Sequence, residues 1–513
     1  MKIRVGIAVA ALCLLPVASY AQYRDGAPQK ADSTVVLTLD DALKVALSEN
    51  VSVKVADMEI ERQQYARKGS YSALLPQVNG SGSYQRTIKK QVMYMGGGSD
   101  DEEGGGGMAG MMAGILDPVM YYITQIIQAG GYMIPPYVAP VKPDEGSSSD
   151  SGFAVGRLNT YSAGINAAMP LVNAQLWESL RLTGDQVELS VEQARESRLG
   201  TVTSVKQAFY AVLMAKEAFE VYKEVYENAV ENFKQTEMRF NAQKASELDL
   251  TRAKANVAAA IPNVYNAENG VMLALWQLKA VMGVDLDLDV DVAGRLGDYA
   301  DRMLAEMHDF DDITLDGNSS LRQLALQAEM LAKTVRMQQY AYLPTLSLSF
   351  AYSYNAMTDD FQFKNYHWTP YSFVGLQLSI PIFSGGKRYH DIKQTRVQAA
   401  ALDLQRINAE RQLKIGIRQG LSTMETAMKT YEASRQGLES AEKAYDIAEK
   451  SYRLGGSTLT DLSNTQLVLT QSRLAVSQAI YNFIVAKASL EQTLGYDFRD
   501  GAGNASLTNP YEK

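Results

Sequence analysis

TLSLSFAYSY, the stretch from residue 345 to 354, alternates large apolar side chains with small ones. Successive side chains of a β-strand point to opposite faces, so the leucines, phenylalanine and tyrosines share one face and the serines the other. GLQLSIP (375–381) and GINAAMP (164–170) repeat the alternation, and a glycine-rich stretch at 78–84 is weak taken alone. Such faces are typical of a transmembrane β-barrel wall, with lipid outside and water inside. The alternative is one sheet of a soluble sandwich, and we favour the barrel because serines would fill a sandwich core poorly.

The same alternation assigns a face to individual side chains in the second half of the chain. Ser349 and Gln377 are expected to face the water-filled interior of the barrel. The side chains that we expect to face lipid are Leu346, Leu348, Phe350, Leu376, Leu378 and Ile380.

Each chain is expected to supply four strands, which are too few to close a barrel. They are predicted at about 76–94, 159–170, 344–354 and 371–382, with a long Gly/Met-rich loop at 95–158. Closed membrane barrels begin at about eight strands, and an open sheet edge does not survive in lipid. Several copies must therefore share one barrel. Two copies would give about 8 strands and three about 12, and the strand pattern does not choose between them.

Two very long helical hairpins are predicted, at 174–282 and 386–494. After Pro170 no proline or clear turn appears until about residue 241, which allows about 100 Å of helix. Both returning helices carry apolar residues every seven positions, and a period of 3.5 residues indicates coiled-coil packing. Pro262 is expected to bend the first of them. The heptad positions are Leu250, Val257, Val264, Val271 and Leu278, then Leu462, Leu469, Val476, Phe483 and Leu490.

Three pairs of similar segments occur in the same order in the two halves of the chain, which suggests an internal duplication. Leu-Pro precedes a strand at 75–76 and again at 343–344, and LKAVMGVD at 278–285 is matched by LEQTLGYD at 490–497. The third pair is the strand at 164–170 and the one at 375–381. We therefore divide the chain into a first repeat (36–285), an equatorial linker (286–317), a second repeat (318–498) and a tail (499–513).

Residues 1–21 are predicted to be a cleaved signal peptide. Lys2 and Arg4 form a charged start, residues 5–17 are apolar, and Ser19-Tyr20-Ala21 fits a small-x-small cleavage site. The apolar core of about 13 residues is shorter than the ~20 that span a membrane. The protein is therefore expected to leave the cytoplasm.

Composition argues against several other classes of protein. The net charge is −9 and there is no basic run, which makes a nucleic-acid partner improbable. The one cysteine, Cys13, lies in the signal segment, and the three histidines lack metal-ligand spacing. No catalytic group of residues, metal or cofactor is therefore expected, and we do not expect an enzyme.

Two segments could be mistaken for metal sites. Aspartates alternate with apolar residues from 285 to 291, but the glycine and glutamate of an EF-hand loop are missing, so we favour a short solvated strand. Methionines crowd the loop at 95–158, and thioethers suit Cu(I). Methionine also fills irregular apolar surfaces, and that interpretation is preferred.

The chain resembles the TolC-like outer-membrane efflux protein family over nearly all of residues 36–498. The motifs that carry the resemblance are PIFSGG (381–386) after a strand and the turn segments Arg239-Phe240…Leu248-Asp249-Leu250 and Tyr452-Arg-Leu-Gly455…Asp461-Leu462. The resemblance implies a mainly helical fold with some strands, in which a homotrimer forms a 12-strand barrel in outer-membrane lipid above a tapering periplasmic α-barrel. It also implies passive export, driven by an inner-membrane pump through a periplasmic adaptor protein.

The resemblance further implies that the turns between the long helices form a gate at the periplasmic tip. Asp461 and Asn464 fall on the two constriction positions, where the family has two aspartates. Tyr452 and Asp249 fall on a pair that holds the tip shut. A second link of the family is missing, because Ser457 and Leu248 replace its arginine and threonine. The turn residues Gly455, Leu462 and Leu250 are expected to meet the adaptor. Gln243 stands where the family usually has a turn glycine. The alternative interpretation is that Asp461 is an ordinary first-turn acid of a helix.

Two functions fit these features. The first is an outer-membrane exit duct of a tripartite efflux or type I secretion system. The second is a structural or adhesive coiled-coil protein anchored by a shared barrel. The polar strand face favours the duct, because an anchored stalk needs no water-lined wall. The exported substrate is not readable from the sequence.

Overall fold

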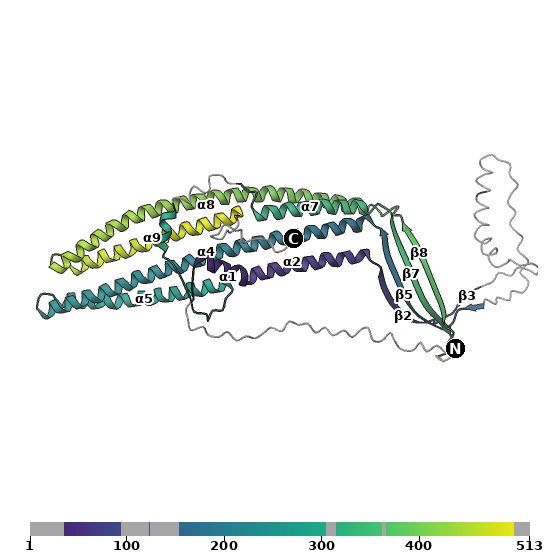
Figure 1. Ribbon diagram of the computed structural model, residues 1–513, viewed down its shortest axis with the longest axis horizontal. Helices are drawn as coiled ribbons and strands as arrows, with labels where there is room; N and C mark the ends of the chain where they lie inside the picture. The colour runs from purple at the N-terminus through teal and green to yellow at the C-terminus, as the bar shows by residue number, and fades with distance from the viewer. Residues whose placement is uncertain (1–34, 94–122, 124–152, 304–313, 362–365, 497–513) are drawn as a thin grey trace, which may run out of the picture. The chain divides into compact units, whose positions relative to one another are not determined.

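A computed structural model describes residues 35–93, 123, 153–303, 314–361 and 366–496 (Figure 1). The predicted signal peptide, the tail at 499–513 and most of the loop at 95–158 lie outside these residues. The described chain is mainly helical with a smaller number of strands, which confirms the expected fold class at that level.

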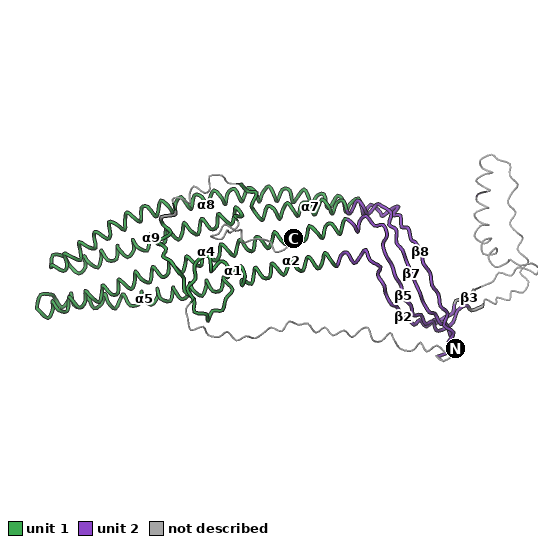
Figure 2. The backbone as a smooth tube through the Cα atoms, viewed as in Figure 1, with its two compact units in different colours: residues 1–68, 178–336, 389–513 green, residues 69–177, 337–388 purple. Residues whose placement is uncertain are grey.

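The chain divides into two compact units, shown in Figure 2. The helical unit comprises residues 1–68, 178–336 and 389–513, and the sheet unit comprises 69–177 and 337–388. Both units draw on both halves of the chain. The compact units therefore cut across the repeats that were predicted along the sequence, because each half contributes two strands to one sheet and several helices to one bundle.

The helical unit is built around two hairpins whose arms have matching lengths. Each hairpin has one helix of 68 residues, about 100 Å long, and a returning helix of 36 residues. None of the described helices has a stretch long and apolar enough to cross a membrane. The helices are α1 (Leu39–Glu49), α2 (Val51–Ser70), α4 (Ala174–Asn241), α5 (Glu247–Met282), α7 (Ser319–Tyr340), α8 (Lys387–Leu454) and α9 (Leu459–Leu494), with a 3-10 helix η2 (Leu296–Arg302).

The predicted heptad positions lie in the packed seams of these helices. In α9, Leu462, Leu469, Phe483 and Leu490 are buried. In α5 the heptad residue Leu278 is fully buried, and the alanines at 253, 260 and 274 are also buried, which allows close approach of the neighbouring helix. α5 continues as one helix through Pro262.

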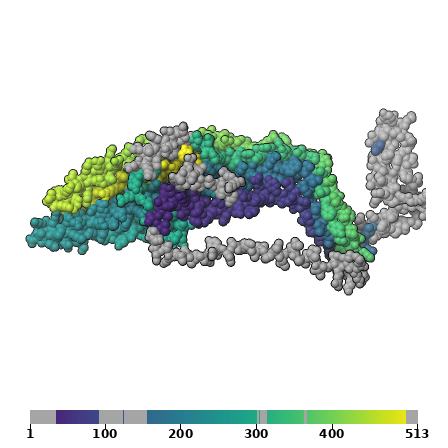
Figure 3. Space-filling model, in the orientation of Figure 1, coloured from purple at the N-terminus to yellow at the C-terminus, as the bar shows by residue number. Residues whose placement is uncertain are grey.

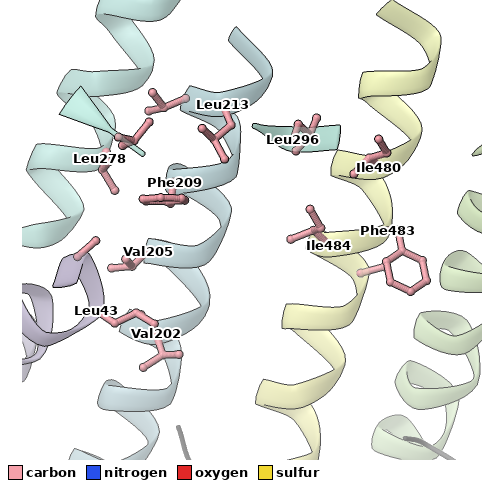
Figure 4. Packing of buried hydrophobic residues seen from close by; sticks show 14 of the residues in the cluster. Leu43, Val202, Val205, Phe209, Leu213, Leu278, Leu296, Ile480, Phe483 and Ile484 are labelled. Carbon is pink, nitrogen blue, oxygen red and sulfur yellow. The ribbon is translucent and has the colours of Figure 1, made fainter. Parts of the chain in front are cut away.

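The main core of the helical unit joins helices from both halves of the chain. Figure 4 shows Leu43 of α1, Phe209 of α4, Leu278 of α5 and Phe483 of α9 among its members, and all four are buried. Each such side chain contributes about 1.5–3 kcal/mol on burial. A short parallel pair, β1 (Val35–Leu37) with β6 (Val290–Val292), lies beside this core and contains part of the predicted linker.

An asparagine forms a joint where the returning helix of the first hairpin meets α2. The side-chain Nδ2 of Asn50 donates to the carbonyl of Val281 at 2.6 Å, and its Oδ1 accepts from the backbone N–H of Ser52 at 2.8 Å. One side chain thus caps the end of α5 and the start of α2.

The second half has the same joint. Nδ2 of Asn318 donates to the carbonyl of Thr493 at 2.7 Å, and its Oδ1 accepts from the N–H of Leu321 at 2.9 Å. Gly495 ends α9 with φ +73, and a Cβ there would lie 2.0 Å from the carbonyl oxygen of Gly317. Only glycine fits this position, because both the backbone angle and the space exclude a side chain.

The sheet unit contains four antiparallel strands in the order β2-β5-β7-β8. A second, two-stranded sheet pairs β3 with β4. The bounds are β2 (Gln77–Arg86), β3 (Gln91–Met93), β4 (Phe153–Val155), β5 (Asn159–Val172), β7 (Thr345–Thr358) and β8 (Thr369–Ser379), with a 3-10 turn η1 (Tyr71–Leu74) before β2.

The strand register aligns apolar residues with apolar residues across the four-stranded sheet. Residues directly opposite in antiparallel strands share a face. One row on the first face runs Val78, Ala167, Phe350 and Val374. The same face carries the side chains expected to meet lipid, since Leu346 pairs with Leu378 and Leu348 with Leu376; Ile380 lies one residue beyond β8.

The opposite face is mostly small and polar. One row runs Ser83, Ser162, Asn355 and Thr369, and the hydroxyls of the two serines lie 2.7 Å apart. Ser349 and Gln377 lie on this face, as the alternation predicts. Tyr371 and Phe373 also project from it, so the polar face is not uniform.

Candidate functional site

The candidate site lies at the end of the helical unit where the two hairpins turn. α4 and α5 are joined there by residues 242–246, and α8 and α9 by residues 455–458. The two turns lie side by side at the left of Figures 1 and 3, and hydrogen bonds between the hairpins join them.

Both turns reverse the chain by the same backbone arrangement. Gln243 and Gly455 each follow the end of a long helix in a left-handed conformation, with φ +61 and +83. Their N–H groups donate to the carbonyls of Phe240 and Tyr452, three residues back. Gln243 therefore occupies the glycine position, as the sequence indicated, although a side chain there is strained by about 1–2 kcal/mol.

The returning helices begin with matched capping boxes. In α5 the hydroxyl of Ser246 accepts from the N–H of Asp249, and the Asp249 carboxylate accepts from Ser246. Thr458 and Asp461 make the same exchange at the start of α9. Each pair satisfies N–H groups that would otherwise lack partners at a helix start.

Asp461 is exposed, and the Thr458 hydroxyl and N–H hold its carboxylate in place. These hydrogen bonds lower the pKa of Asp461 below its ordinary value, because they favour the ionised form. Asn464, three residues on, is also exposed. A fixed negative charge and a neutral amide thus lie one turn apart at the start of α9.

Tyr452 does not make the link with Asp249 that the resemblance implied. Tyr452 is 6 % exposed in a small cluster with Ala253, Leu459 and Leu462, which we call the tip cluster, and its hydroxyl lies 2.7 Å from Oγ1 of Thr236 on α4. The Asp249 carboxylate is bonded to Ser246 instead. The predicted pairing is therefore not formed within this chain, because the Tyr452 hydroxyl and the Asp249 carboxylate are each hydrogen-bonded to another residue.

Leu462 also differs from its predicted role. It is 1 % exposed and packs inside the tip cluster, so it offers no surface to a partner protein. Gly455 is exposed and Leu250 is half-buried, and both stay accessible at the turns. The heptad pattern in α9 already placed Leu462 in a seam, and that signal was the more informative one.

Two further residues of the first hairpin, Arg239 and Asn256, contact the second hairpin at the tip. Arg239 of α4 donates from Nη2 to the carbonyl of Arg453 at 2.5 Å, and its guanidinium lies 5.0 Å from the centroid of the Tyr452 ring. Asn256 of α5 donates to the hydroxyl of Ser463 on α9 at 3.0 Å. No pattern in the sequence indicated a role for Thr236, and Arg239 was recognisable only as part of a turn motif.

A cavity of about 290 Å³ lies behind the tip cluster, between α4, α5 and α9. Side-chain amides and hydroxyls, among them Asn232, Asn263 and Thr470, line it together with alanines and leucines. Elsewhere, of the four aspartates at 285–291 only Asp291 lies in β6, where it pairs with Lys216, and the other three precede that strand. No group of His, Cys, Asp and Glu among the described residues has the arrangement of a metal site.

Long coiled-coil hairpins together with a sheet that has one apolar and one polar face define the class of outer-membrane channel proteins with periplasmic helices. The chain belongs to the outer membrane efflux protein family, which it matches over residues 145–284 and 312–496. It is accordingly an efflux channel protein of the outer membrane.

Individual relatives are distant in sequence. The chain is 22 % identical over 344 residues to the outer membrane protein TolC of Vibrio cholerae, covering 65 % of this chain and 76 % of that one. It is 22 % identical to the alkaline protease secretion protein AprF of Pseudomonas aeruginosa, covering 48 % and 51 %. The fold is similar to that of the outer membrane channel CmeC of Campylobacter jejuni, with a TM-score of 0.60, 16 % identity and coverage of 92 % and 90 %.

Proposed function

We propose that the chain forms the exit duct of a tripartite efflux or type I secretion system and exports its substrates passively. The observation that carries this proposal is the register of the sheet, which collects apolar side chains on one face and small polar ones on the other. A wall between lipid and a water-filled passage needs that division.

Tyrosines support a membrane position for the sheet. Tyr84, Tyr161 and Tyr354 lie on the apolar face toward the same end of the strands, with Tyr352 nearer the middle, and the rings of Tyr84 and Tyr161 stack 4.9 Å apart. Barrels carry such aromatic residues at the level of the lipid headgroups, where a ring can be apolar and its hydroxyl wet.

The proposal includes a homotrimer with a shared barrel. In the described sheet β2 and β8 each pair with one strand only, so both outer edges would be open in lipid. Pairing β8 of one copy with β2 of the next removes every edge. Three copies give about 12 strands, the number that the family resemblance implies.

The two halves are proposed to be repeats of one ancestral unit, covering 36–285 and 318–498 with a linker at 286–317. The equal lengths of α4 and α8, the equal lengths of α5 and α9, and the matched joints at Asn50 and Asn318 support this division.

The proposed partners are a periplasmic adaptor protein and an inner-membrane pump. The similarity to the outer membrane protein TolC and to the alkaline protease secretion protein AprF supports a duct that works with such partners in efflux or in secretion. On this chain the adaptor would meet the exposed turns, with Gly455 and Leu250 at the contact. The buried Leu462 would support those turns from inside.

The gate is proposed at the same tips, with Asp461 and Asn464 lining the constriction. Three copies of Asp461 would place three negative charges around a narrow passage, which favours cations and allows block by multivalent cations. Asn464 would narrow the passage without adding charge.

Conductance of the purified protein in a planar lipid bilayer tests the function. A duct gives discrete, voltage-driven current steps, whereas a stalk anchored by a shared barrel has no continuous passage and gives none. A folded oligomer that never conducts, even after the hairpin contacts are weakened by substitution, would overturn the proposal.

A further inference from the structure

We propose that Thr236 and Arg239 of α4 are the residues that hold the two hairpins together at the tip, in place of the expected link between Tyr452 and Asp249. We call the contacts of Thr236 with Tyr452 and of Arg239 with Arg453 the tip lock. The proposal rests on the proposed function in one respect: the lock regulates export only if the constriction lies at these turns.

The direction of the buried hydrogen bond follows from its neighbours. The Thr236 hydroxyl already donates its proton to the carbonyl of Asn232 at 2.8 Å. Its oxygen is therefore the acceptor at 2.7 Å, and the Tyr452 hydroxyl is the donor. Thr236 is 1 % exposed and Tyr452 is buried, so water cannot replace either partner while the hairpins are together.

Arg239 joins the hairpins by binding a backbone carbonyl, that of Arg453, and not a side chain. Arg453 is the last residue but one of α8, and a carbonyl in the last turn of a helix has no partner within that helix. The guanidinium of Arg239 supplies this partner from the other hairpin and brings a positive charge to the negative end of the α8 dipole. It also lies over the Tyr452 ring, so one side chain supports both parts of the lock.

The lock has a different chemistry from the tyrosine–aspartate pair that it replaces. Its buried part is a bond between two neutral hydroxyl groups, and its charged part is a guanidinium that binds a backbone carbonyl. Neither contact needs a carboxylate on the opposite hairpin. Asp249 is thereby left to cap α5, which it does with Ser246.

The direction of the hydrogen bond predicts an order of effects. Thr236→Val leaves the buried Tyr452 hydroxyl without an acceptor, and a stranded donor is more costly than a lost bond. Tyr452→Phe strands nothing, because Thr236 keeps its bond to Asn232. Thr236→Ser keeps the hydroxyl and should behave as the parent protein does.

Amide hydrogen exchange on the full-length protein in detergent tests the lock without requiring transport. Thr236→Val should speed exchange at 233–243 and 448–458 on the order of tenfold or more, and Tyr452→Phe should speed it less. Thr470→Val is the matched control, since Thr470 is a buried threonine of α9 whose hydroxyl donates to a carbonyl of its own helix, that of Gln466. Tyr445→Phe is the control for Tyr452→Phe, because Tyr445 packs against the same cluster.

The outcomes separate the lock from the gate. Faster exchange in Thr236→Val, rescued by Thr236→Ser and absent in Thr470→Val, supports the lock. Unchanged exchange in Thr236→Val and Arg239→Ala overturns it, and so does an equal effect of Thr470→Val. Faster exchange together with unchanged resting conductance supports the lock and overturns the placing of the constriction at these turns.

Discussion

Arginine scanning of β8 tests both the facing and the depth of the proposed barrel wall. Val374 is the middle residue of the strand, is 71 % exposed and pairs with Phe350 on the apolar face. Leu378, on the same face and 61 % exposed, is next to the last residue of the strand. Val374→Arg and Leu378→Arg therefore place the same charge at two depths of one face.

The expected costs follow from those positions. An arginine on the lipid face destabilises a barrel by about 2–4 kcal/mol at mid-membrane and by about 0–1 kcal/mol near the interface. Val374→Arg should fall in the first range and Leu378→Arg in the second. Three copies share the proposed barrel, so the loss for Val374→Arg would be about 6–12 kcal/mol per assembly.

The controls lie one residue away on the opposite face. Phe373→Arg and Gln377→Arg put the charge where water is expected, so both should change stability by less than their neighbours do. The measurement is denaturant unfolding in lipid vesicles, with the yield of folded protein in the outer membrane as a second readout. Equal losses for Val374→Arg and Phe373→Arg would refute the facing, and a larger loss for Leu378→Arg than for Val374→Arg would refute the depth.

Other substitutions test the tips and the joints. Asp461→Asn should weaken the cation preference of the channel in reversal-potential measurements, while Asp249→Asn should not. Hydrogen bonding lowers the pKa of Asp461, so the cation preference of the parent protein should persist as the pH falls below the ordinary carboxyl pKa. Gly495→Ala should destabilise the protein in thermal unfolding by more than the ~1 kcal/mol expected for Gly455→Ala, because both glycines have positive φ but only the first lacks room for a Cβ. Gln243→Gly should stabilise the tip by about 1 kcal/mol through relief of its left-handed backbone, seen as slower amide exchange at that turn; no change would show that the turn carries no strain.

Periodicity predicted the elements of the fold well. The seven-residue spacing of Leu462, Leu469 and Phe483 identified a packed seam, and all three are buried. The alternation in β7 placed Leu348 and Ser349 on opposite faces, as the register has them. These signals depend on many residues that repeat one local geometry, so the prediction holds despite exceptions such as Tyr371 and Phe373 on the polar face.

The contacts at the tip could not be predicted in the same way. A heptad shows which face of a helix is packed but not which residue of another hairpin lies opposite. Thr236 is uncharged and belongs to no repeating sequence pattern, so nothing in the sequence singles it out. In the structure its hydroxyl is hydrogen-bonded to that of Tyr452. The family resemblance suggested Asp249 as the partner of Tyr452. In this chain the Asp249 carboxylate is bonded to Ser246 in the capping box of α5. The capping pattern Ser246-x-x-Asp249 was itself readable in the sequence.

The two asparagine joints have a consequence for how the length of this protein can change. α5 and α9 end at the joints, but α4 runs past both: Arg195 donates to the carbonyls of Gly317 and Gly495, and the hydroxyl of Ser197 reaches the carbonyl of Ser52. A residue inserted into α4 beyond this point would turn the whole tip by about 100° relative to the joints, since a helix has 3.6 residues per turn. The rotation of α4 about its own axis therefore sets which face of the tip is packed. Insertions of seven residues in both helices of a hairpin would lengthen the hairpin and keep its packed face toward the other hairpin.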